Sequence, residues 1–178
     1  MTNSESRAFE LKRVGPECFS DFYALLEESF IPEEIRSPAD ALAILDNPDF
    51  ILYNIICAGK SAGYISVWRL EELTFVEHFV MRPDLRGQGY GEKAISMLSL
   101  MHGALVLECE PREDEMKRRR AAFYERCGFV ENDIAYTQPS YREGFPEVPL
   151  MLMSTAGALS DPQKTVKDIY IKVYRRDI

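Results

Sequence analysis

Three apolar runs joined by short turns occupy the middle of the chain and restrict its fold more than any other feature. Residues 50–58, 62–70 and 73–81 are rich in β-branched, aromatic and other apolar side chains. Gly59 opens a tight turn after the first run, and Pro83 ends the third. Runs of this length separated by tight turns are typical of neighbouring antiparallel strands. The sequence therefore predicts a three-stranded antiparallel meander.

Helices and further strands flank this meander. Ala94, Met97, Leu98 and Met101 recur at helical spacing and predict a helix over residues 89–102. The other predicted helices are residues 17–29, a helix capped by Ser37 with Pro38 in its first position, residues 114–126 and residues 162–175. The other predicted strands are residues 8–14, 104–108, 132–137 and 149–154. This order predicts an α+β fold (mixed α/β) rather than a purely parallel sheet.

Length and composition exclude several classes of protein. A chain of 178 residues fits one domain, 1–178, in which we expect residues 160–178 to form a C-terminal helical extension. No apolar run approaches the ~20 residues of a membrane span, and the N-terminus has no secretory pattern, so we expect a cytoplasmic protein. Four scattered cysteines and two histidines do not predict a metal site. A net charge of −8 argues against nucleic acid and anionic membrane as partners, and it is compatible with a cationic one.

The hexamer Arg86-Gly87-Gln88-Gly89-Tyr90-Gly91 lies between the end of a predicted strand and the start of a predicted helix. Its glycines let a ligand approach the backbone amides closely, and the helix adds the positive end of its dipole. The Arg86 guanidinium could add a charge-assisted bond to a phosphate. The hexamer therefore predicts a pyrophosphate site, although a glycine-rich turn that binds no ligand would have the same pattern.

A dinucleotide fold is the first alternative. Its Gly-x-Gly-x-x-Gly fingerprint, read from Gly87, requires a third glycine where this chain has Glu92, although Glu108 stands at a tolerable distance for the acidic residue. The hexamer also follows an antiparallel meander instead of the first strand of a parallel sheet. Both features favour a different phosphate-containing ligand.

Phe79-Val80-Met81-Arg82-Pro83 followed by the hexamer resembles the acyl-CoA signature, Gln/Arg-x-x-Gly-x-Gly/Ala, of the GNAT (N-acetyltransferase) superfamily. Tyr124, which stands 33 residues after Gly91, begins Tyr124-Glu125-Arg126-Cys127-Gly128-Phe129 and resembles the second signature. The resemblance covers roughly residues 8–154, and residues 136–141 with 148–150 resemble an uncharacterised bacterial branch.

This resemblance implies a central, mostly antiparallel twisted sheet of about six or seven strands with helices on both faces. A bulged strand would splay from the next one to form the acyl-CoA slot. Backbone groups of Phe79 and Met81 would bind pantetheine, and the N–H of Val80 would polarise the thioester. Arg86, Gly87, Gln88, Gly89, Tyr90 and Gly91 would hold the pyrophosphate of acetyl-CoA.

The implied activity is acetyl transfer from acetyl-CoA to a primary amine of a small molecule or peptide, by direct attack. The amine must lose a proton, and Glu77, Glu108, Glu110 or water are the candidate bases. Glu108 and Glu110 share a strand face, where repulsion and burial would raise one pKa. Tyr124 would be the general acid for the thiolate. The alternative for each carboxylate is an ordinary ion pair, and His78, which alternates away from Glu77, is expected to be a packed or hydrogen-bonded histidine.

Several points stay open. The asparagine that many relatives carry before the second helix is absent here, and Arg118, Arg119 and Arg120 suit either the 3′-phosphate of the donor or an exposed helix face. Residues 30–36 and 136–145 would border the acceptor groove, but they do not identify the amine. A homodimer is compatible with the sequence. A non-catalytic CoA-binding or regulatory module and a nucleotide-cofactor oxidoreductase are the competing functions.

Overall fold

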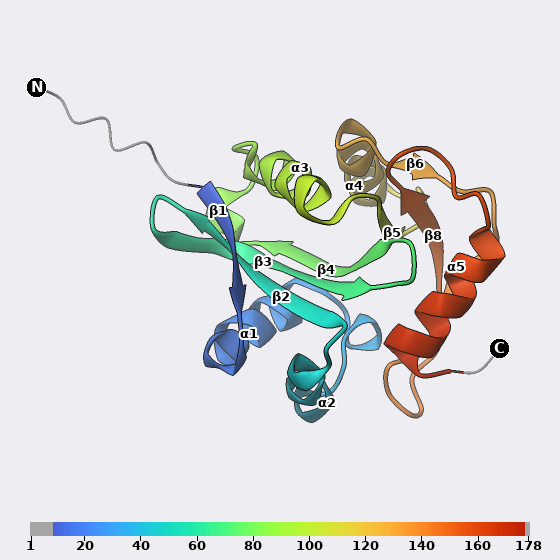
Figure 1. Cartoon of the computed structure of the whole chain (residues 1–178), viewed down its shortest axis with the longest axis horizontal. Coiled ribbons are helices and arrows are strands. Elements are labelled where there is room, and N and C mark those ends of the chain that lie inside the picture. Colours follow the sequence, from blue (N-terminus) through green and yellow to red (C-terminus); the bar gives the residue numbers. More distant parts are fainter. Residues whose placement is uncertain (1–8, 177–178) are drawn as a thin grey trace, which may run out of the picture.

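A computed structural model describes residues 9–176 of the chain. Its sheet has eight strands in the order β1-β2-β3-β4-β5-β8-β6, with β7 paired to β8 beside this path (Figure 1). The strands are β1 (Phe9–Val14), β2 (Phe50–Cys57), β3 (Lys60–Arg69), β4 (Thr74–Met81), β5 (Leu105–Cys109), β6 (Val130–Glu131), β7 (Tyr136–Gln138) and β8 (Val148–Ser154). All described pairs are antiparallel except β4 with β5, which confirms the predicted meander and the mostly antiparallel sheet.

The C-terminal part of the sheet differs from the prediction. The sequence predicts a single strand over residues 132–137, but the structure has two short strands, β6, which ends before this segment, and β7, which begins at its end with Tyr136. Asn132 interrupts the ladder because its side chain donates to the Leu152 carbonyl and to Ser154 Oγ and accepts from the Leu159 N–H. The strand count is therefore eight instead of six or seven.

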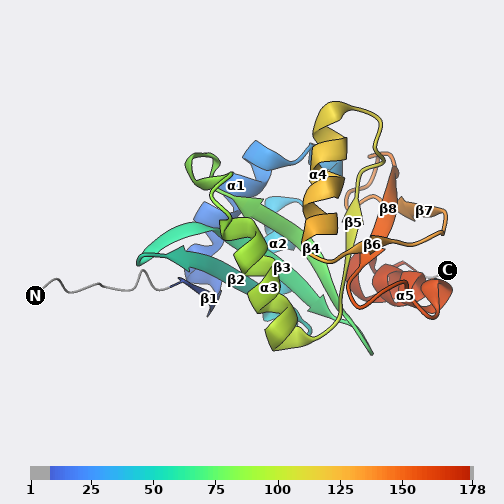
Figure 2. The same cartoon turned by 90° about the horizontal axis from the view of Figure 1, so that it is seen from above.

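Helices cover both faces of the sheet, as predicted. The helices are α1 (Phe19–Ser29), α2 (Pro38–Ala43), α3 (Tyr90–His102), α4 (Glu115–Arg126) and α5 (Pro162–Ile169). Figures 1 and 2 show α3 and α4 next to each other on one face, with α1 and α2 on the other. Buried residues of α1 and α5, such as Phe22 and Ile169, share one apolar core, and those of α3 and α4, such as Leu98 and Ala121, share the second. None of the helices in residues 9–176 combines the length and the apolar character of a membrane span.

The helix boundaries follow local chemistry. Ser37 caps α2 by accepting from the Asp40 N–H, and Pro38 occupies the first turn, as the sequence predicts. The predicted helix over residues 162–175 divides into α5 and a π-helical segment, Tyr170–Tyr174. Val173 and Tyr174 of this segment are buried in the same core as α1.

Strand β4 is irregular in two ways, in its register with β3 and in its short pairing with β5. The register between β3 and β4 shifts from Ser66 opposite His78 to Val67 opposite Val76, so that Glu77 is the extra residue of a β-bulge. In addition, β4 pairs with β5 only over three positions, beginning at Thr74 with Leu105 and ending at Val76 with Leu107. Beyond Val76 the two strands are no longer paired, which confirms the expected splay.

Candidate active site

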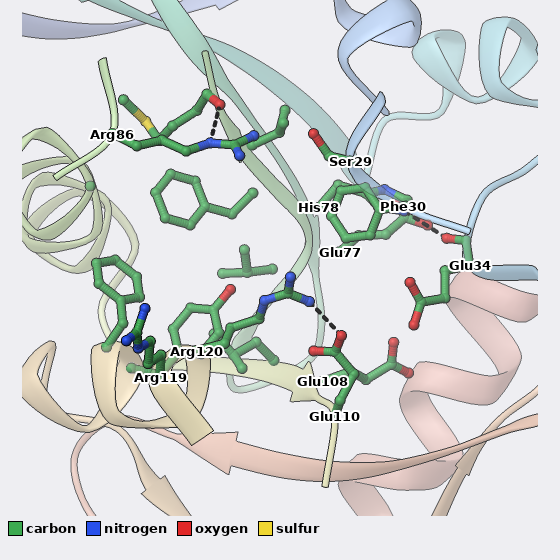
Figure 3. A pocket seen from close by; sticks show the side chains of 18 of the residues that line it. Ser29, Phe30, Glu34, Glu77, His78, Arg86, Glu108, Glu110, Arg119 and Arg120 are labelled. Atoms are coloured by element: carbon green, nitrogen blue, oxygen red, sulfur yellow. Dashed lines mark hydrogen bonds and ion pairs between the residues drawn. The ribbon is translucent and has the colours of Figure 1, made fainter. Parts of the chain in front are cut away.

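A cleft of about 980 Å³ opens where β4 and β5 separate. Its walls come from β4, β5, the hexamer before α3, the inner face of α4, the end of α1 and the loop between β7 and β8. This volume is at the upper end of what is usual for ligand sites. In Figure 3 the carboxylates of Glu34, Glu108 and Glu110 lie on one side of the cleft, and Arg86 and Arg119 lie on the other.

The hexamer begins α3 with backbone that is open to a ligand. Gly87 and Gly89 have φ angles of 72° and 78°, which glycine adopts without strain, and no atom lies within 4 Å of where their Cβ atoms would be. The first N–H groups of an α-helix have no intrahelical acceptor, and Gly89 is the N-cap of α3. Gly91 is needed for packing, since its Cβ would lie 3.1 Å from Cζ of Phe123.

The side chains of the hexamer divide between the cleft and the protein. Arg86 lines the cleft, and its Nε donates to the Met81 carbonyl at 3.0 Å. Gln88 Nε2 donates to the Asp84 carbonyl, and the Tyr90 ring stacks on Phe9 of β1. These two side chains contact the protein and do not line the cleft. Residues 88 and 90 would therefore contact a ligand through their backbone.

The splayed half of β4 provides the next wall. Phe79, Val80 and Met81 all line the cleft, and they pair with β3 but not with β5. The Arg82 N–H donates to the Ala62 carbonyl of the chain before β3, so by alternation Val80 directs its backbone groups to β3, whereas Phe79 and Met81 direct theirs to the cleft. This agrees with the role that the resemblance implies for Phe79 and Met81 and contradicts the one for the Val80 N–H. Phe79 also stacks on Phe123 of α4, with 6.0 Å between ring centroids, and this contact joins the two walls.

Glu77 has a partner that the sequence did not indicate. Its carboxylate forms an ion pair with Arg36 and accepts from Trp68 Nε1 and the Tyr141 hydroxyl, both at 3.0 Å. The side chain is 1% exposed. Burial acts to raise the pKa of Glu77, but the Arg36 guanidinium, with His78 and the hydrogen bonds, outweighs burial and holds the pKa below its ordinary value. A carboxylate bound in this way is a poor proton acceptor.

His78 is packed and hydrogen-bonded, as predicted, but it does not alternate away from Glu77. Its ring nitrogen Nε2 lies 2.9 Å from the Glu34 carbonyl, its ring packs on Phe30 and Tyr141, and Nδ1 is 3.8 Å from Glu77. The bulge explains the error, because the extra residue cancels one step of strand alternation. Burial is the main cause that lowers the pKa of His78.

Glu108 is a partly buried acid that lines the cleft. The Tyr174 hydroxyl lies 2.8 Å from both of its carboxylate oxygens, and the Tyr136 hydroxyl donates to one of them. Burial is the largest influence and, together with the charges of Glu77 and Glu34, it outweighs these two donors and raises the pKa to about 7. At neutral pH such a carboxylate is available to accept a proton.

Glu110 does not act on Glu108 in the expected way. The sequence predicts that mutual repulsion and burial together raise one of the two pKa values. Burial does raise the pKa of Glu108, but Glu110 forms an ion pair with Arg120 and is not among the main charges that act on Glu108. The carboxylates that repel Glu108 are instead Glu77 and Glu34, which come from β4 and from the segment after α1. Burial also raises the pKa of Glu34, with Glu110 as the next cause.

Tyr124 lies at the junction of α4 with the cleft. Its ring packs edge-on against Phe123 and Phe129, and the residue is 9% exposed. No residue in the described part of the chain forms a hydrogen bond with its hydroxyl, and burial raises its pKa above the ordinary value. The hydroxyl is therefore protonated at neutral pH and available to a ligand.

Among residues 9–176, no three or more His, Cys, Asp or Glu side chains form a group suited to a metal ion.

Comparison with known proteins agrees with this geometry. The family model for the acetyltransferase (GNAT) domain matches residues 48–131. A Bacteroides thetaiotaomicron protein assigned to the GNAT acetyltransferases is 30% identical, covers 94% of this chain and 99% of its own, and superposes with a TM-score of 0.88. The chain belongs to the GNAT acetyltransferase family.

Two further proteins are similar to this GNAT chain, one in sequence and one in fold. YjbC of Bacillus subtilis, assigned as an acetyltransferase, is 30% identical over 112 residues, which are 61% of this chain and 56% of YjbC. The match thus spans little more than half of this curated relative. The ribosomal-protein-S18-alanine N-acetyltransferase of Escherichia coli has a TM-score of 0.59 at 16% identity, over 88% of this chain and 98% of its own, and this likeness concerns the fold.

The GNAT signatures omit three residues that complete the site, namely Arg36, Tyr136 and Tyr174. Arg36 precedes the matched residues 48–131 in the chain, and Tyr136 and Tyr174 follow them. Arg36 and Tyr136 fall inside segments that the sequence placed near the acceptor groove, but their contacts with Glu77 and Glu108 were not predicted. Tyr174 belongs to the predicted C-terminal helix, where an amphipathic pattern indicates packing alone. A tyrosine on the buried side of this helix was the one available signal.

Proposed function

We propose that this protein transfers an acetyl group from acetyl-CoA to a primary amine. The observation that carries the proposal is a cleft lined by an open helix N-terminus, by the partly buried Glu108 carboxyl with its pKa raised to about 7, and by the protonated Tyr124. Membership of the GNAT family supports the same reaction class.

The donor side of the cleft suits acetyl-CoA. The backbone from Gly87 to Gly91 would hold its pyrophosphate at the N-terminus of α3, and Arg86 and Arg119 line the same side. The backbone groups of Phe79 and Met81 that do not bond to β3 would bind the pantetheine arm, and one of their N–H groups would be the oxyanion donor. Space is present in front of Gly87 and Gly89, where a Cβ would meet no protein atom within 4 Å.

Two residues would move protons. Glu108 would accept the proton that the amine loses as its nitrogen bonds to the thioester carbon, directly or through a water. Tyr124 would donate its hydroxyl hydrogen to the sulfur as the carbon–sulfur bond breaks. The products are an amide and a free thiol, and both residues then exchange their protons with solvent. Glu77 is not needed as a base, because Arg36 stabilises its charge.

The charge of the acceptor side supports an amine as the substrate. Glu28, Glu34, Glu108 and Glu110 line this part of the cleft beside Phe30 and Tyr141. Among them, Glu110 is neutralised by Arg120, whereas Glu34 has no ion-pair partner within residues 9–176. A protonated amine would be attracted here, whereas a carboxylate substrate would be repelled.

Thiol release from acetyl-CoA over a panel of amines tests the proposal. We expect turnover with at least one amine, and we expect Glu108→Gln and Tyr124→Phe each to lower kcat by about 10²-fold. Glu72→Gln and Tyr53→Phe remove the same groups outside the cleft and should keep wild-type rates. Thermal stabilisation by acetyl-CoA without turnover would favour a non-catalytic CoA-binding module, and stabilisation by NAD alone would favour an oxidoreductase.

A further inference from the structure

The C-terminal segment contacts Glu108, which lines the cleft, and it packs in the apolar core shared with α1. After α5 the chain continues as the π-helical segment Tyr170–Tyr174, a rare conformation that often occurs at functional sites. This segment is held at several points, since Arg36 donates to the Val173 carbonyl at 2.7 Å and Lys172 donates to the Arg69 carbonyl at 3.0 Å. Tyr174 therefore has a fixed position.

The contacts of Tyr174 are directed at one acid. Its hydroxyl is 2.8 Å from Oε1 and 2.8 Å from Oε2 of Glu108, and it is 3.4 Å from the Tyr141 hydroxyl. Tyr141 in turn donates to Glu77, which binds Arg36. The two hydroxyls lie 3.4 Å apart, and each donates its one hydrogen to a different carboxylate, Tyr141 to Glu77 and Tyr174 to Glu108.

From this geometry we propose that Tyr174 is a positioning residue, which holds the Glu108 carboxylate in its ionised form with a fixed orientation in the cleft. The inference rests on the proposed function, in which Glu108 is the base. A donor to the charged form of an acid favours that form, and a buried carboxylate without donors is strongly disfavoured. The C-terminal segment, outside the family match, is thereby part of the catalytic apparatus.

The surroundings of Glu108 allow this effect to be isolated. The groups that interact with its carboxyl are Tyr136, Tyr141, Tyr170, Tyr174, Glu34 and Glu77. Tyr136 and Tyr174 are the two hydrogen-bond donors among the residues that the structure describes, and the acidic groups act through charge. Removal of either hydroxyl should raise the pKa of Glu108 further above about 7.

The test compares Tyr174→Phe with a matched control, Tyr170→Phe. Tyr170 lies in the same segment, but its hydroxyl donates to the Thr137 carbonyl and not to Glu108. In Tyr174→Phe we expect the acidic limb of kcat/KM to move up by about one pH unit, which is a loss of about tenfold at pH 6.5 that disappears near pH 9. Tyr136→Phe should shift the limb in the same direction, and Tyr170→Phe should leave it in place.

Carbon-13 NMR of labelled glutamate carboxyls measures the same pKa without turnover, with Glu108→Gln to assign the signal. A higher pKa in Tyr174→Phe supports the inference. An unchanged pKa, or a loss of rate that is equal at every pH, overturns it. If no amine is acetylated but the carboxyl pKa still rises, the contact with Glu108 stands and the acetyltransferase proposal fails.

Discussion

The ion pair between Arg36 and Glu77 gives the sharpest prediction about stability. Their side chains are 8% and 1% exposed, so each charge depends on the other for its solvation. Replacement of Arg36 by methionine keeps much of the side-chain volume but leaves the Glu77 carboxylate with only the Trp68 and Tyr141 donors. Removal of one partner of a buried pair costs about 3–5 kcal/mol.

This cost converts into a measurable shift. For a domain of this size, 1 kcal/mol lowers Tm by about 2–4 °C, so Arg36→Met should lower it by about 6–20 °C at pH 7. The double variant Arg36→Met with Glu77→Gln removes both charges and should recover much of the loss, because a neutral amide is cheaper to bury. Circular dichroism gives Tm, and Trp68, the one tryptophan of the chain, gives a second probe beside the pair.

The loss of stability in Arg36→Met should depend on pH. In the wild type the pKa of Glu77 is lowered, so its contribution is complete above the unfolded pKa and is lost as pH falls through the folded pKa. Without Arg36, burial raises the folded pKa instead, and the penalty of Arg36→Met should be smaller at pH 5 than at pH 7. A Tm within about 2 °C of the wild type at pH 7 would refute the argument.

Three other predictions concern the cleft. The wild-type kcat/KM should rise with pH through about 7 as Glu108 ionises, and this rise should be absent from the residual activity of Glu108→Gln. Gly89→Ala places a side chain at a φ of 78°, so it should cost about 1 kcal/mol of stability and raise the KM for acetyl-CoA, with Gly103→Ala, also at positive φ, as a control outside the cleft. Glu34→Gln should raise the KM for a cationic amine several-fold and leave the KM for acetyl-CoA unchanged; equal effects on both would contradict the assignment of the acceptor side.

Local signals were enough to predict most of the fold. The helix α3 begins within one residue of its predicted start, because glycine precedes it and an apolar stripe defines it. The meander follows from apolar runs joined by short turns, of two residues (58–59) and four residues (70–73), which leave the register little freedom. The residues 132–137 were predicted less well, because the choice between ladder and loop depends on the bonds of Asn132 with Leu152 and Ser154, about 20 residues away.

The residues of the site also differ in whether local sequence predicts them. Gly87, Gly89 and Tyr124 were identified from local sequence, since a helix N-terminus and a helix with a Gly-Phe turn are local structures. The partner of Glu77 lies 41 residues earlier in the chain, and the donor from Tyr174 to Glu108 lies 66 residues later. Spacing alone cannot predict which charges or hydroxyls will meet across a sheet, and the bulge at Glu77 removes even the alternation on which such a guess would rest.

This division also explains why the sequence indicates the donor and does not identify the acceptor. The proposed donor elements lie within the matched residues 48–131, where the backbone of one turn would bind a phosphate. The proposed acceptor side is lined by segments on both sides of that range, including Glu34 and Tyr141, whose side chains come together only after the sheet has formed. A few substitutions in the segments outside residues 48–131 could therefore change the substrate and leave the hexamer Arg86–Gly91 unaltered. The identity of the amine must therefore be sought in those segments.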